Sequence, residues 1–187
     1  MDIPTRKECF ELIQKTRMLD HIIDHSVMVS NVCFFLCRSL IPGCPTLKAE
    51  LAVSAALLHD ITKTRSFDTN ENHCETGGHM LRKMGYPEVA DIIRQHVILD
   101  RYDPDTAITE QELVNYSDKR VLHDDIVSLD QRLEYIEKRY AGCVEDFTRR
   151  FALMAAKTRT LERKIFSRLA ISPGQLAGSV KPWITRI

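Results

Sequence analysis

Residues 55–63 read AALLHDITK, an apolar run that ends in an adjacent histidine and aspartate, His59 and Asp60. A lysine, Lys63, follows three residues after the aspartate. Ionisable groups at the end of an apolar segment are costly to bury unless they pair with another group or bind a metal. The stretch therefore predicts that both side chains have partners inside the fold.

The pattern on both sides of this stretch is helical. Apolar residues recur at helical spacing over 22–40, and Thr46 is a candidate cap for the helix that leads into AALLHDITK. A short helix is predicted at 73–83, and residues 66–72 are predicted to form a polar loop. Helix-start signals follow at three positions: Pro87, Thr109 and Ser128.

The C-terminal third carries one more long apolar stripe, which predicts a helix from about Glu145 to about Ala170. No stretch has the alternation typical of a strand. We therefore expect an all-α protein, an irregular bundle of about seven or eight helices.

Composition limits the class of protein. The chain has 187 residues, of which 44% are apolar and 28% charged, as in ordinary globular domains. Lys plus Arg equals Asp plus Glu, 26 of each. A neutral chain has no general attraction for polyanions, so neither nucleic acid nor a membrane surface is expected as a partner. Small anionic substrates need only a local positive pocket and remain open.

The N-terminal stretch MDIPTRKECF lacks the basic-then-apolar pattern of a signal peptide, and no apolar run approaches the length of a bilayer span. We therefore expect a cytoplasmic protein. Its six cysteines are then expected to be reduced, small apolar residues of a helical core.

Four polar residues share the predicted inward faces of four different helices: His25, His59, His96 and Asp118. Side chains that converge from several helices build the metal sites of helical bundles, and imidazole and carboxylate are common ligands. No cysteine lies at these positions, which argues against a structural zinc site. Adjacent helical residues point about 100° apart, so Asp60 would approach the same centre from beside His59.

In this order the residues resemble the HD superfamily of metal-dependent phosphohydrolases, named after its His-Asp dipeptide. LLHDITK is similar to the LLHDIGK of that family, and YSDKRV supplies the final aspartate. HCETGGHMLRKMG and PEVADIIRQHV resemble the segments that carry two more histidines in members with two metals. The resemblance covers roughly residues 19–125, and the pattern H…HD…H…H…D falls on His25, His59, Asp60, His73, His96 and Asp118.

The resemblance implies an HD-type helical fold. We expect a single domain over residues 1–187, with an HD-type metal-binding core at 19–125 and a C-terminal helical extension at 126–187. It also implies two divalent ions, iron or manganese, which the six residues named above would hold, with Asp60 as the bridge.

The implied reaction is hydrolysis of a phosphoester or phosphoanhydride bond in a small, nucleotide-like substrate by a metal-bridging hydroxide. Asp60 and Lys63 are the expected catalytic residues. The expected substrate-binding cations are Lys63, Lys119 and Arg120. Thr62 stands where the family often has glycine, which would alter how the neighbouring lysine approaches a phosphate.

Two other functions stay open at this point. Some HD-fold proteins are di-iron oxygenases that use the same ligand set on a polyol or a phosphonate. Others are non-catalytic scaffolds, which typically lose their ligands, whereas all six positions are filled here. The sequence also leaves a homodimer open.

Overall fold

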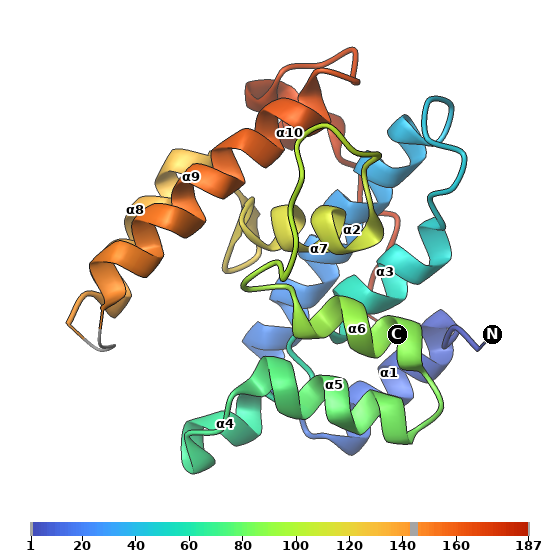
Figure 1. The fold of residues 1–187 in the computed structure, drawn as a ribbon. Helices are drawn as coiled ribbons and strands as arrows, with labels where there is room; N and C mark the ends of the chain where they lie inside the picture. The colour runs from blue at the N-terminus through green and yellow to red at the C-terminus, as the bar shows by residue number, and fades with distance from the viewer. Residues whose placement is uncertain (1, 143–145, 187) are drawn as a thin grey trace.

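Figure 1 shows the computed structural model, which describes residues 2–142 and 146–186. The regular secondary structure of this part of the chain is almost entirely helical, so the all-α prediction is confirmed. It contains more helices than the seven or eight expected, because several are short. The elements are α1 (Arg6–Lys15), α2 (Asp20–Leu40), α3 (Ala49–Leu58), α4 (Lys63–Thr69), α5 (His73–Lys83), α6 (Pro87–Arg94), α7 (Glu110–Asp118), β1 (Val121–Leu122), β2 (Asp125–Ile126), α8 (Leu129–Tyr140), α9 (Phe147–Phe166), a 3-10 turn (Pro173–Gln175) and α10 (Leu176–Ser179).

Helix α3 lies at the centre of the molecule. Every residue from Leu51 to Leu58 is buried, as expected for a helix that is apolar on all sides. Helices α1, α2, α6 and α7 all pack against it. The helix begins at Ala49 with Lys48 at the N-cap, so the predicted cap at Thr46 is wrong. Because α3 runs through the core, its C-terminal end delivers His59 and Asp60 to the interior.

Helices α5 and α6 form a tightly packed antiparallel pair, and both predicted starts are confirmed. Close approach depends on Gly78, where an added Cβ would lie 3.1 Å from the carbonyl oxygen of Ala90 on α6. The Asn72 side chain caps α5 by accepting hydrogen bonds from the backbone N–H groups of Cys74 and Glu75. The first turn of α5 is thereby fixed in place.

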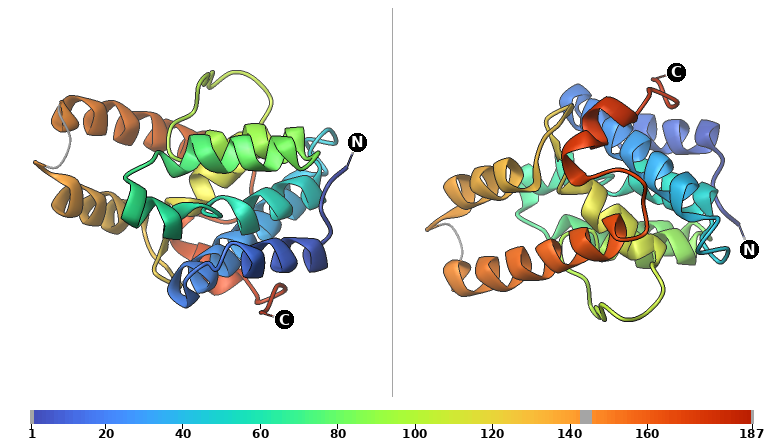
Figure 2. Two further views of the ribbon diagram at one scale, coloured as in Figure 1. Left: turned by 90° about the horizontal axis from the view of Figure 1, so that it is seen from below. Right: turned by 90° about the horizontal axis from the view of Figure 1, so that it is seen from above.

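Helices α8 and α9 form a hairpin that projects from the rest of the molecule (Figure 2). A buried ion pair joins the C-terminal end of α9 to α7. Lys164 Nζ lies 2.7 Å from a carboxylate oxygen of Glu112. The expected helix start near Glu145 lies outside the described residues. The helix ends at Phe166, a few residues before the expected end.

Beyond α10, the chain returns to α2, where the Trp183 ring stacks on Phe34.

Two further local predictions were wrong. Residues 63–69 form helix α4 in place of most of the polar loop predicted at 66–72. This helix buries no residue, so it has no apolar stripe by which the sequence could reveal it. The hairpin β1–β2, paired Val121 with Ile126 and Leu122 with Asp125, is too short to show alternation.

No helix of the described residues is long and apolar enough to cross a membrane. Five cysteines are described, and all five are free: Cys9, Cys33, Cys37, Cys44 and Cys74. The sixth, Cys143, lies outside the described residues.

Candidate metal centre

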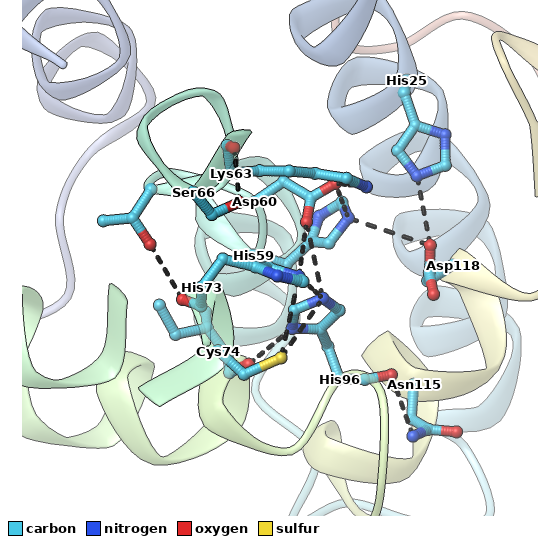
Figure 3. A network of polar contacts seen from close by, with 12 residues as sticks. His25, His59, Asp60, Lys63, Ser66, His73, Cys74, His96, Asn115 and Asp118 are labelled. Carbon is cyan, nitrogen blue, oxygen red and sulfur yellow. Dashed lines mark hydrogen bonds and ion pairs between the residues drawn. The ribbon is translucent and has the colours of Figure 1, made fainter. Parts of the chain in front are cut away.

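The structure brings all six predicted ligands into one cluster (Figure 3). His25 lies within α2, whereas the others lie at helix ends. His59 and Asp60 follow α3 in a turn, and His96 follows α6. These three residues were expected within helices but lie just beyond helix ends. His73 opens α5 and Asp118 closes α7.

Three imidazoles are oriented by the same kind of hydrogen bond. The Nδ1 atoms of His25, His59 and His96 each hydrogen-bond a backbone carbonyl, at 2.8, 2.7 and 2.6 Å respectively. The accepting carbonyls belong to His123, Ala56 and Ile93. A neutral imidazole has one N–H, and here the Nδ1–H group donates it to the carbonyl. The Nε2 atom therefore carries a lone pair that faces the cluster. Metal-bound histidines are typically held in this way.

The first half of the cluster lies between α2, α3 and α7. Nε2 of His25 is 3.1 Å from Oδ1 of Asp118. Nε2 of His59 is 3.3 Å from Oδ2 of Asp60 and 3.9 Å from the same Asp118 oxygen. These atoms are all electron-rich, and the imidazole hydrogens point away from them. Such an arrangement is stable when a cation lies between the atoms.

The second half lies between α3, α5 and α6. Oδ1 of Asp60 is 3.3 Å from Nε2 of His73 and 3.5 Å from Nε2 of His96. The two Nε2 atoms are 3.2 Å apart. Asp60 therefore stands between the halves, with one carboxylate oxygen facing each.

Two buried atoms of the six predicted ligands have no hydrogen-bond partner among the described residues, Nε2 of His59 and Oδ1 of Asp60. An unpaired buried polar atom costs about 1–3 kcal/mol, so a fold rarely leaves two side by side without a ligand. Imidazole and carboxylate are ligands for divalent metals. The donor atoms therefore fit the metal that the sequence pattern implies.

The charge states also suit a cation. Burial would raise the pKa of Asp60, but its contacts with His59 and Lys63 outweigh burial and hold that pKa well below its usual range. Asp118 behaves alike: burial would raise its pKa, but its close contact with His25 and the nearby cations Lys119 and Arg132 outweigh burial and hold that pKa well below the usual range. Burial lowers the pKa of His59, which keeps the ring neutral.

The second half of the cluster, around His73 and His96, favours bound positive charge more strongly than the first half. Burial opposes the charged form of His96, yet contacts with Asp60 and Cys74 raise the pKa of its imidazole to about 10. Burial would likewise raise the pKa of Cys74, but its contacts with His73 and His96 lower that pKa to about 6. A thiol and two imidazoles beside a carboxylate thus form a corner that favours a bound proton or metal ion.

Lys63 lies at the mouth of the cluster. Its Nζ donates a 2.7 Å hydrogen bond to Oδ2 of Asp60, and its side chain is 30% exposed. The His73 side chain is 23% exposed, whereas His59 and Asp60 are buried. Access to the cluster is therefore from the side of Lys63 and His73. Burial opposes the charge on Lys63, but the attraction of Asp60 outweighs it and raises the lysine pKa.

The departure from glycine at Thr62 has a structural role. The Thr62 hydroxyl donates a 2.8 Å hydrogen bond to the backbone carbonyl of His73. This bond ties the turn that carries Asp60 to the start of α5. It leaves Lys63 free to reach the carboxylate.

The other two predicted substrate-binding cations do not reach the mouth. Lys119 is buried, and its Nζ donates to the backbone carbonyls of His96 and Asn115. Arg120 is buried and binds the Tyr116 hydroxyl, Glu162 and two backbone carbonyls. These contacts use two of the three N–H donors of Lys119 and most donors of Arg120, and Lys119 Nζ also lies 3.6 Å from Oδ2 of Asp118. Both residues therefore brace the fold, and these contacts give no support to their expected role in binding substrate.

Two residues of the cluster were missed. Cys74 is 6% exposed, and its Sγ lies 3.7 Å from Nε2 of His73, so the expectation that no cysteine lies among the inward-facing ligand positions was wrong. Arg132 reaches Asp118 from α8, with its terminal nitrogen 3.5 Å from Oδ1. No periodic signal marks either residue, since Cys74 merely follows a ligand and Arg132 belongs to a helix beyond the region of resemblance.

Comparison with known proteins agrees with the geometry. Similar curated proteins include ribonuclease Y from two strains of Thermus thermophilus, each 34% identical over 90 residues. The match covers 48% of this chain but only 14% of either relative. No solved structure gives a significant match. The model of the HD domain family matches residues 22–126, more than half of the chain, and we conclude that the protein belongs to the HD domain family.

Proposed function

We propose that this protein is a metal-dependent phosphohydrolase that cleaves a phosphoester or phosphoanhydride bond of a small, nucleotide-like substrate. The observation that carries the proposal is the position of Asp60. Its Oδ2 faces His59 and its Oδ1 faces His73 and His96, at 3.3–3.5 Å. A carboxylate in this position can join two metal ions.

The chain's donors divide into two sets for such ions. The first set is His25, His59, Asp60 and Asp118, and the second contains Asp60, His73 and His96. When bound, a pair of divalent ions supplies Lewis acidity toward phosphoryl oxygens and makes water a stronger nucleophile at neutral pH. Mixed nitrogen and oxygen ligands suit iron, manganese or zinc.

Two cations of the protein would orient the phosphate. Lys63 stays protonated beside Asp60 at the exposed mouth, where its Nζ can turn toward a phosphoryl oxygen. Arg132 is mostly buried beside Asp118, and its Nε has no hydrogen-bond partner among the described residues. An unused guanidinium donor at this place suits a bound phosphoryl oxygen. In this proposal Arg132 takes the role that the sequence suggested for Arg120.

The nucleotide part of the proposal has one support. The similar proteins from Thermus thermophilus are named as ribonucleases, and RNA is itself a chain of nucleotides joined by phosphodiester bonds.

The test joins metal analysis with activity. The full chain, purified without chelators, is analysed for bound metals and assayed on nucleotides, dinucleotides and simple phosphoesters. We expect about two ions per chain and turnover of one phosphate class. Asp60→Asn should lose metal and hydrolysis yet keep its helical circular dichroism.

The control is Asp124→Asn, in the chain's second His-Asp pair, where Asp124 is exposed. This variant should keep both metal and activity. Hydrolysis by metal-free protein would contradict the proposal. Oxygen consumption with a polyol or a phosphonate, without hydrolysis, would replace it with the oxygenase.

A further inference from the structure

Cys74 differs from Cys9 and Cys33 in what its sulfur faces. The sulfur atoms of Cys9 and Cys33 lie 3.8 and 3.7 Å from backbone carbonyl oxygens in the apolar core. Cys74 Sγ instead lies 3.7 Å from Nε2 of His73 and 3.9 Å from Nε2 of His96 (Figure 3). The capped first turn of α5 holds it there.

The spacing of these atoms matches a tetrahedral ion. With zinc–nitrogen bonds of about 2.05 Å and zinc–sulfur bonds of about 2.3 Å, tetrahedral angles put two nitrogens about 3.3 Å apart and nitrogen and sulfur about 3.6 Å apart. The measured separation is 3.2 Å between the two Nε2 atoms of His73 and His96. The two nitrogen–sulfur separations to Cys74 are 3.7 and 3.9 Å. The spacing is therefore close to that of a bound ion.

An independent observation points to a fourth ligand beside the two imidazoles. Oδ1 of Asp60 is buried, has no hydrogen-bond partner among the described residues, and points at the same two imidazoles from 3.3 and 3.5 Å. For oxygen and nitrogen around one tetrahedral zinc, the expected separation is again about 3.3 Å.

We propose that Cys74 is a thiolate ligand of the second metal ion, together with His73, His96 and Asp60. This inference rests on the proposed two-metal function and deepens it. Thiolate is a soft ligand that favours zinc over manganese or magnesium, whereas the first half offers only nitrogen and oxygen. The two halves therefore differ in metal preference, and the second selects zinc in place of the iron or manganese that the sequence suggested.

The test uses cobalt as a spectroscopic substitute for zinc. The full chain is stripped with a chelator and titrated with Co²⁺, and the near-ultraviolet charge-transfer band of a thiolate–cobalt bond is recorded with the number of ions bound. Wild type should show the band. Cys74→Ser and Cys74→Ala should lose it and bind zinc in the second half at least about 100-fold more weakly, because a lost direct ligand costs at least as much as a lost supporting contact.

The matched control is Cys44→Ala, because Cys44 is 8% exposed and Cys74 is 6% exposed. This control should keep the band, and circular dichroism checks the fold of each variant. Two bound cobalt ions without a band in wild type, or a band that survives in both Cys74 variants, would overturn the thiolate ligand and leave the two-metal function standing. Failure of wild type to bind any cobalt would overturn the proposed function as well.

Discussion

Gly78→Ala should separate the two helices that carry the second half of the metal centre. Residue 78 lies on α5, five residues after His73, and faces α6, which leads to His96. An alanine Cβ at this position would lie 3.1 Å from the carbonyl oxygen of Ala90, closer than ordinary van der Waals contact. Because a backbone carbonyl cannot rotate aside, α5 itself must move by a few tenths of an ångström.

The magnitude follows from two opposing effects. Alanine in place of a helical glycine gains about 1 kcal/mol of helix propensity. Overpacking costs about 1–3 kcal/mol, and the upper end applies where the contact is rigid. Gly78→Ala should therefore lower the free energy of unfolding by about 1–2 kcal/mol. It should also weaken zinc binding at His73 and His96, since their Nε2 atoms are only 3.2 Å apart.

Two other glycines provide the controls. Nothing lies within 4 Å of a Cβ added at Gly178, so Gly178→Ala should be neutral or slightly stabilising. At Gly77 the added Cβ would meet the flexible end of Ile93 at 3.2 Å and the Thr62 hydroxyl at 3.3 Å, so an intermediate effect is expected. Urea unfolding followed by circular dichroism measures all three. If Gly78→Ala were as stable as Gly178→Ala, the close-packing argument would be refuted.

Three further outcomes are expected. Lys164→Met leaves the Glu112 carboxylate buried without its partner, so it should lower the free energy of unfolding in urea by about 3–5 kcal/mol. A decrease below about 1 kcal/mol would show that the ion pair is dispensable. Arg132→Ala should raise the KM for a phosphate substrate while both ions stay bound, whereas loss of metal would mean that it only supports Asp118. In chelator-treated protein, the contacts of His96 raise the pKa of its imidazole to about 10. The protonated imidazole therefore stabilises the folded state. This contribution is fully present below the unfolded pKa of about 6.5 and is lost as the pH rises to about 10. The difference in unfolding free energy between wild type and His96→Gln should therefore shrink from about pH 6 to about pH 10, and a constant difference would count against the raised pKa.

Much of the fold could be read from local signals. The capping boxes at Thr109 and Ser128 and the proline at the start of α6 mark real helix starts. These signals work because the groups that satisfy a helix end lie within a few residues in sequence. Helix α4 escaped prediction for the converse reason: it buries nothing, so no apolar period records it.

The cluster was predictable only in part. The helical period puts His25 and Asp118 on buried faces, and both do lie there. His73 came only from the family resemblance, because the first residue of a helix has no earlier turn to show its face. Cys74 and Arg132 were missed altogether, and Arg120 was assigned to substrate although its donors bind Tyr116 and Glu162.

The sequence by itself determined most of the helices, the buried faces of the longer ones, and the entry of His25, His59, His96 and Asp118 into the core. The tertiary structure alone decided which of those groups meet. The turn after α3 places Asp60 between two sets of ligands, and the close contact of α5 with α6 brings Cys74 to His96. The physical reason is that hydrophobic periodicity fixes rotation about each helix axis, whereas distances between helices depend on side-chain packing across the core.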